Sequence, residues 1–417
     1  MKNKVLTGLL LVLIGGWGNL LAQNAGSNYA RQVNTLIGTK GVGLTSGYLY
    51  PGATYPYGMV QFTPSYFSKR SGFVINQLSG GGCEHMGNFP TFPVKGKLKM
   101  SPDNILNYRI NISEEKGHAG YYEAMVQEDI KAKLTVTERT GMASYEYPAD
   151  QQYGTVIIGG GISATPIEQA AIVITAPNKC EGYAEGGNFC GLRTPYKVYF
   201  VAEFDADALE SGTWKRDELK PNTTFAEGEY SGVYFTFDVS KKKNVQYKIG
   251  VSYVSVENAR ENLKAENTGW DFLQIQNQAE SKWNHYLGKI EVEGTNPDRA
   301  TQFYTHLYRS FIHPNVCSDV NGEYMGADFR VHKSRSKHYT SFSNWDTYRT
   351  QIQLLSILDP EVASDIVISH QLFAEEAGGA FPRWVMANIE TGVMQGDPTP
   401  ILISNAYAFG ARNYDPK

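Results

Sequence analysis

The segment from Tyr339 to Arg349 brings together side chains whose types are suited to binding a sugar ring. Trp345 could stack on the apolar face of such a ring. Asp346 could accept hydrogen bonds from vicinal hydroxyls, and Arg349 could orient that carboxylate. A simpler interpretation is a buried aromatic residue at a helix start, with Asp346 as N-terminal cap and Arg349 as its partner. The motif alone leaves both interpretations open.

Two further places carry candidate groups. Arg383 and Trp384 follow a Gly-Gly turn, where they could form a second wall of a pocket or pack in the core. Glu390 and Asp397 lie in a stretch between predicted helices, and loops of this kind often carry functional groups. The adjacent Glu375 and Glu376 end a predicted helix and point in different directions, so a solvated helix face is favoured over a catalytic pair.

Other clusters give weaker signals. His306 and His313 lie near one face of a predicted helix, and packing or hydrogen bonding is favoured over a metal site. The loop between His332 and His338 is basic and is most simply a solvated turn. Gly80–Gly82 follows no strand–helix pattern, so a phosphate loop is not supported. Motifs for a Ser or Cys nucleophile are absent from the sequence.

The N-terminus has the features of an export signal. Lys2 and Lys4 precede the apolar run Val5–Ile14, and the small Ala22 offers a cleavage position, so residues 1–22 are predicted to be a signal peptide. The apolar run is short for a membrane span, and no lipid-anchor Cys follows. Removing two lysines takes the net charge from −4 to about −6, which gives no reason to expect nucleic acid as partner. We expect a periplasmic or extracellular protein without an integral membrane span.

An oxidising compartment permits disulfides among the four cysteines. Cys180 and Cys190 flank what reads as a short Gly-rich loop, and their pairing is possible but left open. Cys83 and Cys317 are more simply interpreted as buried thiols. A zinc site is less favoured because no second Cys or His pair lies nearby at ligand spacing.

The chain divides into two parts of different character. Residues 28–256 read as short strands separated by turns, which predicts a β-sandwich. The clearest strand signals lie at Ile130–Thr137, Tyr153–Gly159, Ala171–Ala176, Tyr196–Phe204, Gly232–Val239 and Val245–Val256.

Helix formers dominate after this sandwich. Residues 257–293 are predicted to be a helical linker, in which Trp270–Leu287 shows helical spacing and includes Leu273, and a brief strand follows at Lys289–Val292. Residues 294–417 then contain predicted helices at Pro297–Ile312, Tyr348–Leu358, Pro360–Ala377 and Thr399–Ala411. We interpret these as the start of an all-helical barrel with too few helices to close.

Four ordered blocks resemble the N-terminal portion of glycoside hydrolase family 92. The blocks are Val33–Thr39 with Pro51–Gln61; Leu78–Cys83; Phe303 through Pro314–Val316 and Asp319–Tyr324 to Trp345–Arg349; and Gly378–Trp384 with Gly396–Asp397. The resemblance implies a β-sandwich, a helical linker and an (α/α)6 barrel. It implies calcium-assisted, inverting hydrolysis of terminal mannose from glycans by an exo-α-mannosidase, of which α-1,2-mannosidases are examples. Within this frame the sugar-binding candidates are Trp345, Asp346, Arg349, Arg383, Trp384 and Asp397.

The sequence departs from the family pattern at three places. The usual histidine-containing run is replaced by Phe73–Gln77, Val385 stands where Glu is common, and Gly396–Thr399 replaces Gly-Asp-His-Ala. A different linkage or glycan is therefore an open alternative. The resemblance also implies that the catalytic acid, the catalytic base and most calcium ligands lie beyond Lys417, so no residue here is assigned those roles.

Two alternatives to the hydrolase remain. A non-catalytic carbohydrate-binding protein would keep the sandwich and part of the sugar pocket. A sugar phosphorylase could share a sandwich and helical barrel, but the sequence shows no convincing phosphate site.

Overall fold

The computed structural model of the protein describes residues 28–40, 47–65, 72–103, 111–294 and 296–416. The predicted signal peptide, residues 1–22, lies outside these ranges. Within them, no helix is both long enough and apolar enough to cross a membrane.

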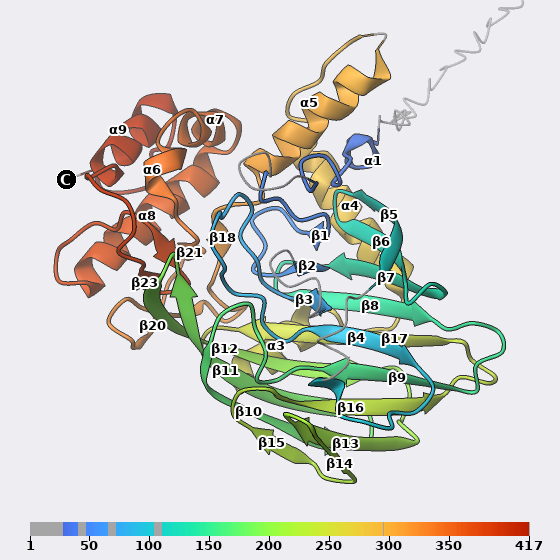
Figure 1. Cartoon of the computed structure of the whole chain (residues 1–417). Helices are drawn as coiled ribbons and strands as arrows, with labels where there is room; N and C mark the ends of the chain where they lie inside the picture. The colour runs from blue at the N-terminus through green and yellow to red at the C-terminus, as the bar shows by residue number, and fades with distance from the viewer. Residues whose placement is uncertain (1–27, 41–46, 66–71, 104–110, 295, 417) are drawn as a thin grey trace, which may run out of the picture.

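Two antiparallel sheets form the N-terminal part (Figure 1). The first has the order β1 (Ala53–Thr54), β2 (Gln61–Pro64), β3 (Phe73–Val74), β4 (Thr91–Lys95), β9 (Tyr153–Ile158), β16 (Ser231–Asp238), β13 (Glu210–Lys215) and β14 (Glu218–Pro221). The second has the order β15 (Phe225–Glu227), β10 (Ile167–Ala176), β11 (Lys179–Phe189), β12 (Leu192–Phe204), β17 (Asn244–Ser252), β8 (Thr140–Glu146), β7 (Ile130–Val136), β6 (Tyr121–Val126) and β5 (Ile112–His118).

The side chains between these sheets make the larger core of the molecule. Along β7 the buried positions alternate at first with half-buried ones, as a strand with one covered face requires. Aromatic rings fill much of the core, and Phe204 of β12 lies 4.8 Å from Phe235 of β16 and 5.3 Å from Tyr247 of β17 between ring centroids. All six predicted strands are present, which confirms the alternation from which they were inferred.

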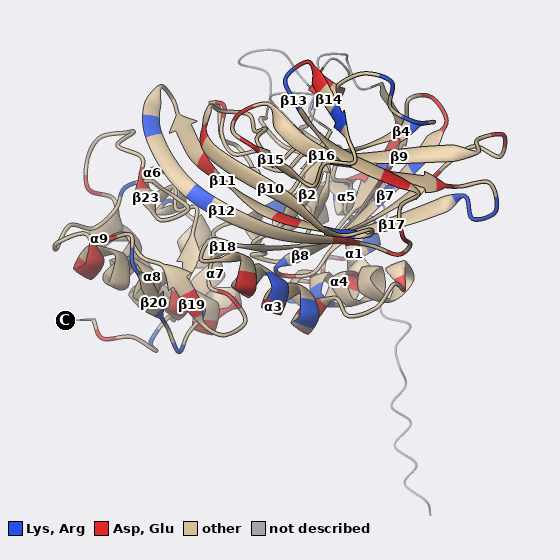
Figure 2. Cartoon of the chain, turned by 90° about the horizontal axis from the view of Figure 1, so that it is seen from below, with Lys and Arg blue, Asp and Glu red and all other residues tan. Residues whose placement is uncertain are grey.

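Two helices follow the sheets, and both lie along one face of the second sheet (Figure 2). Ser255 caps α3 (Val256–Glu266) and Asp271 caps α4 (Phe272–Leu287), each by accepting a backbone N–H in the first turn. Trp283 of α4 is fully buried and donates its Nε1–H to Thr54 O at 2.7 Å. Leu273, one of the apolar residues from which this helix was predicted, is 58% exposed, because it lies on the solvent side of the helix.

The C-terminal part is helical, with three short β-ladders between its helices. The helices are α5 (Pro297–Ser310), α6 (Asn344–Thr347), α7 (Gln351–Leu358), α8 (Pro360–Glu376) and α9 (Thr399–Phe409), while α1 (Tyr29–Gln32) comes from the N-terminus. The ladders pair β18 (Asn315–Val316) with β21 (Tyr339–Thr340), β19 (Glu323–Met325) with β20 (Val331–Lys333), and β22 (Val385–Met386) with β23 (Ile389–Glu390).

Caps define the boundaries of these helices. Asn296 and Asp359 cap α5 and α8, each with Pro at the first helical position, as the sequence signals predicted. The helix expected from Tyr348 begins instead at Gln351, because Thr350 has φ +63° and interrupts the helical backbone. The strand predicted at Lys289–Val292 is wrong: this stretch is irregular in the described chain.

A two-sheet β part followed by a helical part confirms the predicted order of architectures. That the helices belong to an incomplete (α/α)6 barrel stays a prediction, as do the domain boundaries.

Buried polar contacts join the two parts. Arg139, at the β7–β8 turn, forms an ion pair with Glu266 of α3 at 2.7 Å and donates to Ser318 O at 2.7 Å. Asp319 is 2% exposed and accepts from Ser252 Oγ, Asn258 Nδ2 and Asn262 Nδ2 at 2.6–2.9 Å. The junction is therefore hydrogen-bonded as well as packed.

The disulfide joins Cys83 to Cys190, while Cys180 and Cys317 are buried free thiols. The prediction for Cys317 agrees, but the pairing considered for Cys180 and the thiol expected at Cys83 are wrong. The stretch between Cys180 and Cys190 is not a loop. It is strand β11, whose extended backbone places these two cysteines at opposite ends.

Candidate functional site

A cavity of about 480 Å³ lies where the β part meets the helical part. The β part contributes the loop Leu78–Cys83 and the turn at Phe189–Cys190. The helical part contributes residues around His313, helices α6 to α9, and Trp384 with Met394. The lining thus joins segments that are far apart in the sequence.

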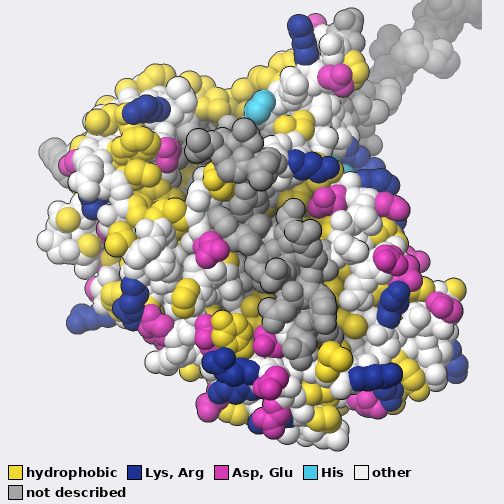
Figure 3. All heavy atoms as spheres, in the orientation of Figure 1, with side chains coloured by type: hydrophobic (Ala, Val, Ile, Leu, Met, Phe, Trp, Pro, Cys, Tyr) yellow, Lys and Arg dark blue, Asp and Glu magenta, His cyan; other side chains and the backbone are white. Residues whose placement is uncertain are grey.

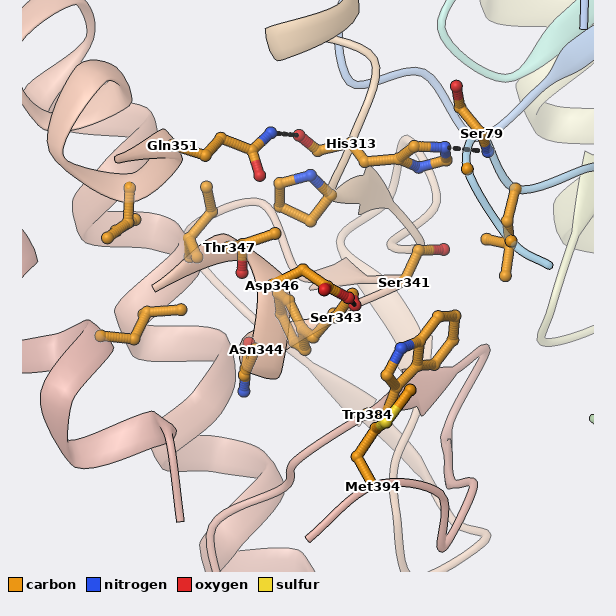
Figure 4. Close-up of a pocket in the computed structure, with 18 of the residues that line it drawn as sticks. Ser79, His313, Ser341, Ser343, Asn344, Asp346, Thr347, Gln351, Trp384 and Met394 are labelled. Carbon is orange, nitrogen blue, oxygen red and sulfur yellow. Dashed lines mark hydrogen bonds between the residues drawn. The ribbon is translucent and has the colours of Figure 1, made fainter. Parts of the chain in front are cut away.

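Two histidines hold the glycine-rich loop. Leu78 N donates to His85 Nε2 and Ser79 N donates to His313 Nε2, both at 2.8 Å, so consecutive amides of the loop are fixed (Figure 4). His85 lies in the β part, whereas His313 follows α5 in the helical part. The second contact therefore bridges the junction at the edge of the cavity.

Both rings are neutral with the same tautomer. Burial lowers the pKa of His85 and of His313 to about 4. Because each Nε2 accepts an amide hydrogen, each Nδ1 carries the proton and donates it at 2.7 Å, to Cys83 O in one case and to Asn315 Oδ1 in the other. These rings are hydrogen-bonded on both sides, so we assign them to positioning the loop rather than to proton transfer.

An aromatic wall forms another side of the cavity. The rings of Phe189 and Trp384 are 4.5 Å apart between centroids, and Trp384 is 7% exposed. The Cys83–Cys190 disulfide ties the residue after Phe189 to the end of the glycine-rich loop. Loop, turn and tryptophan are thus connected into one continuous surface.

Asp346 of α6 provides a carboxylate to the cavity. It lies in the exposed first turn of α6 and accepts a hydrogen bond from Ser343 Oγ. Figure 4 shows Ser341, Ser343 and Asp346 near one another, with Trp384 beside them, and Ser343 and Trp384 form an isolated antiparallel backbone bridge. Among the described residues that line the cavity, Asp346 alone carries a carboxylate.

The deep wall is apolar. Ile352, Leu355, Ile366 and Leu402, from α7, α8 and α9, present buried side chains to the cavity. Asn344 of α6 anchors this wall, because its Oδ1 lies 3.0 Å from Nε2 of a buried histidine of α8, His370. Its amide also donates to Pro382 O at 3.0 Å and to Thr399 Oγ1 at 2.8 Å.

The structure separates the residues of the Trp345–Arg349 motif. Asp346 lines the cavity, but Trp345 does not; it is 40% exposed, with the Arg349 guanidinium 5.6 Å from its ring centroid. Arg349 Nε donates to Tyr348 OH at 2.7 Å, so the idea that Arg349 orients Asp346 finds no support in the described contacts. Successive residues of a short helix point in different directions, which explains this separation.

The residues of the second motif are also divided. Trp384 lines the cavity, whereas Arg383 donates to Met394 O at 3.0 Å and lies outside its lining. Glu390 accepts from Arg383 N at 2.7 Å and Trp384 N at 3.2 Å, so it holds the backbone of this segment. Asp397 is exposed and does not line the cavity.

The remaining candidates have structural surroundings. Glu375 is exposed, and Glu376 accepts from Tyr324 OH at 2.6 Å and Ala327 N at 2.9 Å. His338, expected in a solvated turn, is 6% exposed, because it stacks on Tyr324 at 3.7 Å between centroids. Across the described ranges, no group of three or more His, Cys, Asp or Glu side chains is placed to hold a metal ion.

Sequence reasoning missed most of the cavity. The glycine-rich loop was singled out only as an unsupported phosphate loop, whereas the hydrogen-bonding role favoured for His313 over a metal site agrees with its contacts. Phe189, Ser341 and the apolar helix faces carry no local signal, because their role depends on which distant segments meet. His85 and Cys83, close to the glycine run, were the accessible hint of a fixed loop.

Comparisons with known proteins agree with this geometry. The family model for the glycosyl hydrolase family 92 N-terminal domain matches residues 32–252, and that for the family's catalytic domain matches residues 258–417. An uncharacterized secreted glycosidase of Arthroderma benhamiae is 26% identical over 363 residues, covering 77% of this chain and 45% of that protein.

Two solved structures have the same fold. A family GH92 α-mannosidase from Bacteroides thetaiotaomicron shares 25% identity with a TM-score of 0.84, covering 93% of this chain and 55% of that chain. A family GH92 inverting mannosidase from Bacteroides thetaiotaomicron VPI-5482 shares 24% identity with a TM-score of 0.80, covering 93% and 54%. The chain thus spans about half the length of these relatives.

Proposed function

Because the chain belongs to glycoside hydrolase family 92, we propose that its cavity binds the terminal mannose of a glycan for exo-acting hydrolysis. The observation that carries this proposal is that Asp346 and the Phe189–Trp384 ring pair line the same cavity. The similar α-mannosidase of Bacteroides thetaiotaomicron supports mannose as the sugar. Because this chain spans about half the length of that relative, the substrate of the whole protein is proposed and not shown.

The cavity offers complementary contacts to a hexose. Trp384 and Phe189 provide an apolar surface for the C–H face of the ring. Asp346 accepts hydrogen bonds from two hydroxyls, and the hydroxyls of Ser341 and Ser343 can donate or accept. The enclosed, apolar back wall favours binding of one chain end over passage of a long glycan, in keeping with exo action.

Hydrolysis with inversion needs two carboxyl groups, roughly 6.5–9.5 Å apart, one to protonate the leaving oxygen and one to activate water. Asp346 is the single carboxylate among the described lining residues, and we assign it to sugar binding. We propose inversion from the family resemblance. That the acid and base lie beyond Lys417 stays a prediction.

Calcium is proposed on the same ground, and no residue is assigned to it as a ligand. The donor set does not fit: the described residues contain no convergent group of three acidic, His or Cys side chains, and the cavity offers one carboxylate. No step of the reaction is therefore derived through the ion. We further propose that the protein is exported, since a similar protein bears the name of a secreted glycosidase.

Linkage specificity is proposed to differ from that of α-1,2-mannosidases. Three family positions are altered here, at Phe73–Gln77, Val385 and Gly396–Thr399. Of these, Phe73–Gln77 directly precedes the glycine-rich loop of the cavity; its residues are buried and do not line the cavity, so its composition would act on specificity through the position of that loop.

Binding and hydrolysis are measured separately with the 417-residue protein. Titration calorimetry with methyl α-mannoside should show binding, which Asp346→Asn weakens by about 3- to 30-fold through loss of charge-assisted hydrogen bonds. Asp328→Asn is the control, because Asp328 is a half-buried aspartate that lies outside the cavity. Unchanged affinity in Asp346→Asn would contradict the assignment of this cavity.

Hydrolysis of an aryl α-mannoside, with and without a chelator, tests catalysis and calcium. Proton NMR of the released sugar distinguishes inversion from retention. Binding without turnover in this chain favours the carbohydrate-binding alternative, which the single lining carboxylate also favours.

A further inference from the structure

A second cavity, of about 440 Å³, lies between the β part and helices α4 and α8. Its lining shares no residue with that of the first cavity. It is built from the turn at Tyr55–Tyr57, Glu138, α4, Lys337 and the N-terminal half of α8.

Phenol rings form its floor. Tyr57, Tyr286 and Tyr339 are buried, and the ring of Tyr57 lies 5.6 Å from that of Tyr286 and 6.1 Å from that of Tyr339, edge to face. Tyr57 is 2% exposed, yet its hydroxyl has no hydrogen-bond partner among the described residues. A buried hydroxyl left without a partner is costly, so a water or ligand hydroxyl that reached this nearly inaccessible atom would be favoured.

The walls carry both charges in near balance. Lys337 Nζ lies 2.6 Å from Glu138 Oε2, and Lys289 Nζ lies 3.3 Å from Asp359 Oδ2. Asp365, half-buried, faces the same space, and burial raises its pKa to about 6. The exposed rim adds Lys282, His285 and Glu361.

This chemistry selects among ligand classes. An anion is disfavoured because two of the three lysines already pair with carboxylates. A metal ion is disfavoured because no group of three suitable ligands converges in the described chain. A largely apolar ligand would leave carboxylates and a phenol unpaired. A neutral molecule rich in hydroxyls satisfies ammonium donors, carboxylate acceptors and phenols together, while the rings cover its C–H surface.

We propose that this second cavity is a saccharide-binding site, separate from the mannose cavity, with Tyr57 and Asp365 as hydrogen-bonding residues and Tyr286 as part of the floor. The site needs no catalytic group, and its existence does not depend on hydrolysis in the first cavity. A glycan-processing protein with two such sites could hold a branched substrate at a second sugar.

The test uses the 417-residue protein and methyl α-mannoside, with methyl α-glucoside as a second probe, in titration calorimetry and saturation-transfer NMR. The wild type should show two sites. Trp384→Ala, or Asp346→Asn if the first variant does not fold, should leave the second site intact. In that background, Tyr57→Phe and Asp365→Asn should each weaken the remaining binding by about 3- to 10-fold.

Asp328→Asn in the same background is the matched control and should leave the affinity unchanged. Thermal unfolding checks that Tyr57→Phe and Asp365→Asn remain folded; if one does not, the other carries the test. The inference would be overturned if neither probe bound in the Trp384→Ala or Asp346→Asn background. It would also be overturned if binding there were unaffected by both Tyr57→Phe and Asp365→Asn.

The outcomes also separate this inference from the proposed function. If Trp384→Ala and Asp346→Asn abolish all binding, the mannose cavity stands and the second site falls. If they change nothing while Tyr57→Phe and Asp365→Asn abolish binding, the second site stands and the proposed cavity falls.

Discussion

Four buried histidines share a chemical state. Burial lowers the pKa of His85, His313 and His370 to about 4 and that of His338 to about 3, from an ordinary value near 6.5. His85 and His313 bond through both ring nitrogens, each accepting from a loop amide and donating to an oxygen, whereas both ring nitrogens of His370 face oxygens, of which a neutral ring can donate to one. Neutral imidazole is therefore a structural component of the cavity walls.

These pKa values predict how stability depends on pH. Between about pH 6.5 and 4 the unfolded chain binds protons at these histidines and the folded chain does not, so stability is fully present above pH 6.5 and is lost as pH falls. Each histidine contributes up to about 1.4 kcal/mol per pH unit in that window. Urea unfolding at pH 7 and pH 5 should show a markedly lower free energy of unfolding at pH 5.

His313→Gln identifies the contribution of one ring, since an amide oxygen can still accept from Ser79 N but cannot titrate. Its pH slope should be shallower than that of the wild type by about one proton. His306→Gln, at an exposed histidine of α5, is the control and should keep the wild-type slope. A wild-type slope in His313→Gln would show that His313 is not neutral in the folded protein.

Residue types predicted the cavity only in part. An aspartate beside a tryptophan was a sound signal for Asp346, and Trp384 was found from the Gly-Gly turn that precedes it. Trp345 and Arg349 lie outside the lining of this cavity, because direction on a four-residue helix depends on tertiary packing rather than on spacing.

At the level of elements, strand alternation and helix caps were reliable because they report local burial and hydrogen bonding. Strand β11 was missed because its four glycine and alanine positions read as a loop, although buried neighbours on both sides stabilise it as a strand. The disulfide error followed directly from that error. Pairing of strands distant in sequence, which decides such cases, leaves no mark in a local window.

The disulfide can be checked chemically. When the protein is denatured without reductant, alkylation should modify two cysteines, Cys180 and Cys317; with reductant it should modify four. Peptide mapping should recover Cys83 linked to Cys190. A peptide linking Cys180 to Cys190 would contradict the structure.

The junction gives a second prediction for elements. Asp319→Ala removes the acceptor for Ser252 Oγ, Asn258 Nδ2 and Asn262 Nδ2 and leaves these donors buried, so the free energy of unfolding should fall by about 2–4 kcal/mol. Asp328→Ala, at a half-buried aspartate paired with His332 near the surface, should cost less than about 1 kcal/mol. If denaturant titrations gave equal losses of unfolding free energy for the two variants, the buried cluster would stabilise the protein no more than the Asp328–His332 pair does.

At the scale of the whole molecule, the surface of the helical part is unusually apolar. Figure 3 shows hydrophobic side chains gathered over this part of the chain. On helices α7 and α9, which pack against each other, Ile357 is 60%, Ile401 51% and Phe409 45% exposed. Contiguous apolar surface of this kind promotes association.

The 417-residue chain should therefore self-associate with rising concentration. Ile357→Lys combined with Ile401→Lys should reduce the mass measured by light scattering towards that of a monomer, with little change in thermal stability. Leu209→Lys, at an equally exposed residue of the β part, is the matched control. Association that is unaffected by the double substitution would place the contact elsewhere.

The Phe189–Trp384 contact and the His313–Ser79 hydrogen bond each join the β part to the helical part at the rim of the cavity. A sugar bound there touches both parts and has no complete site when they are apart. By thermodynamic linkage, the bound sugar stabilises the docked arrangement of the two parts by RT ln(1 + [L]/Kd). Ligand should therefore slow hydrogen exchange at the contact surfaces between the two parts, far from the sugar, making the saccharide a probe of how firmly they are docked.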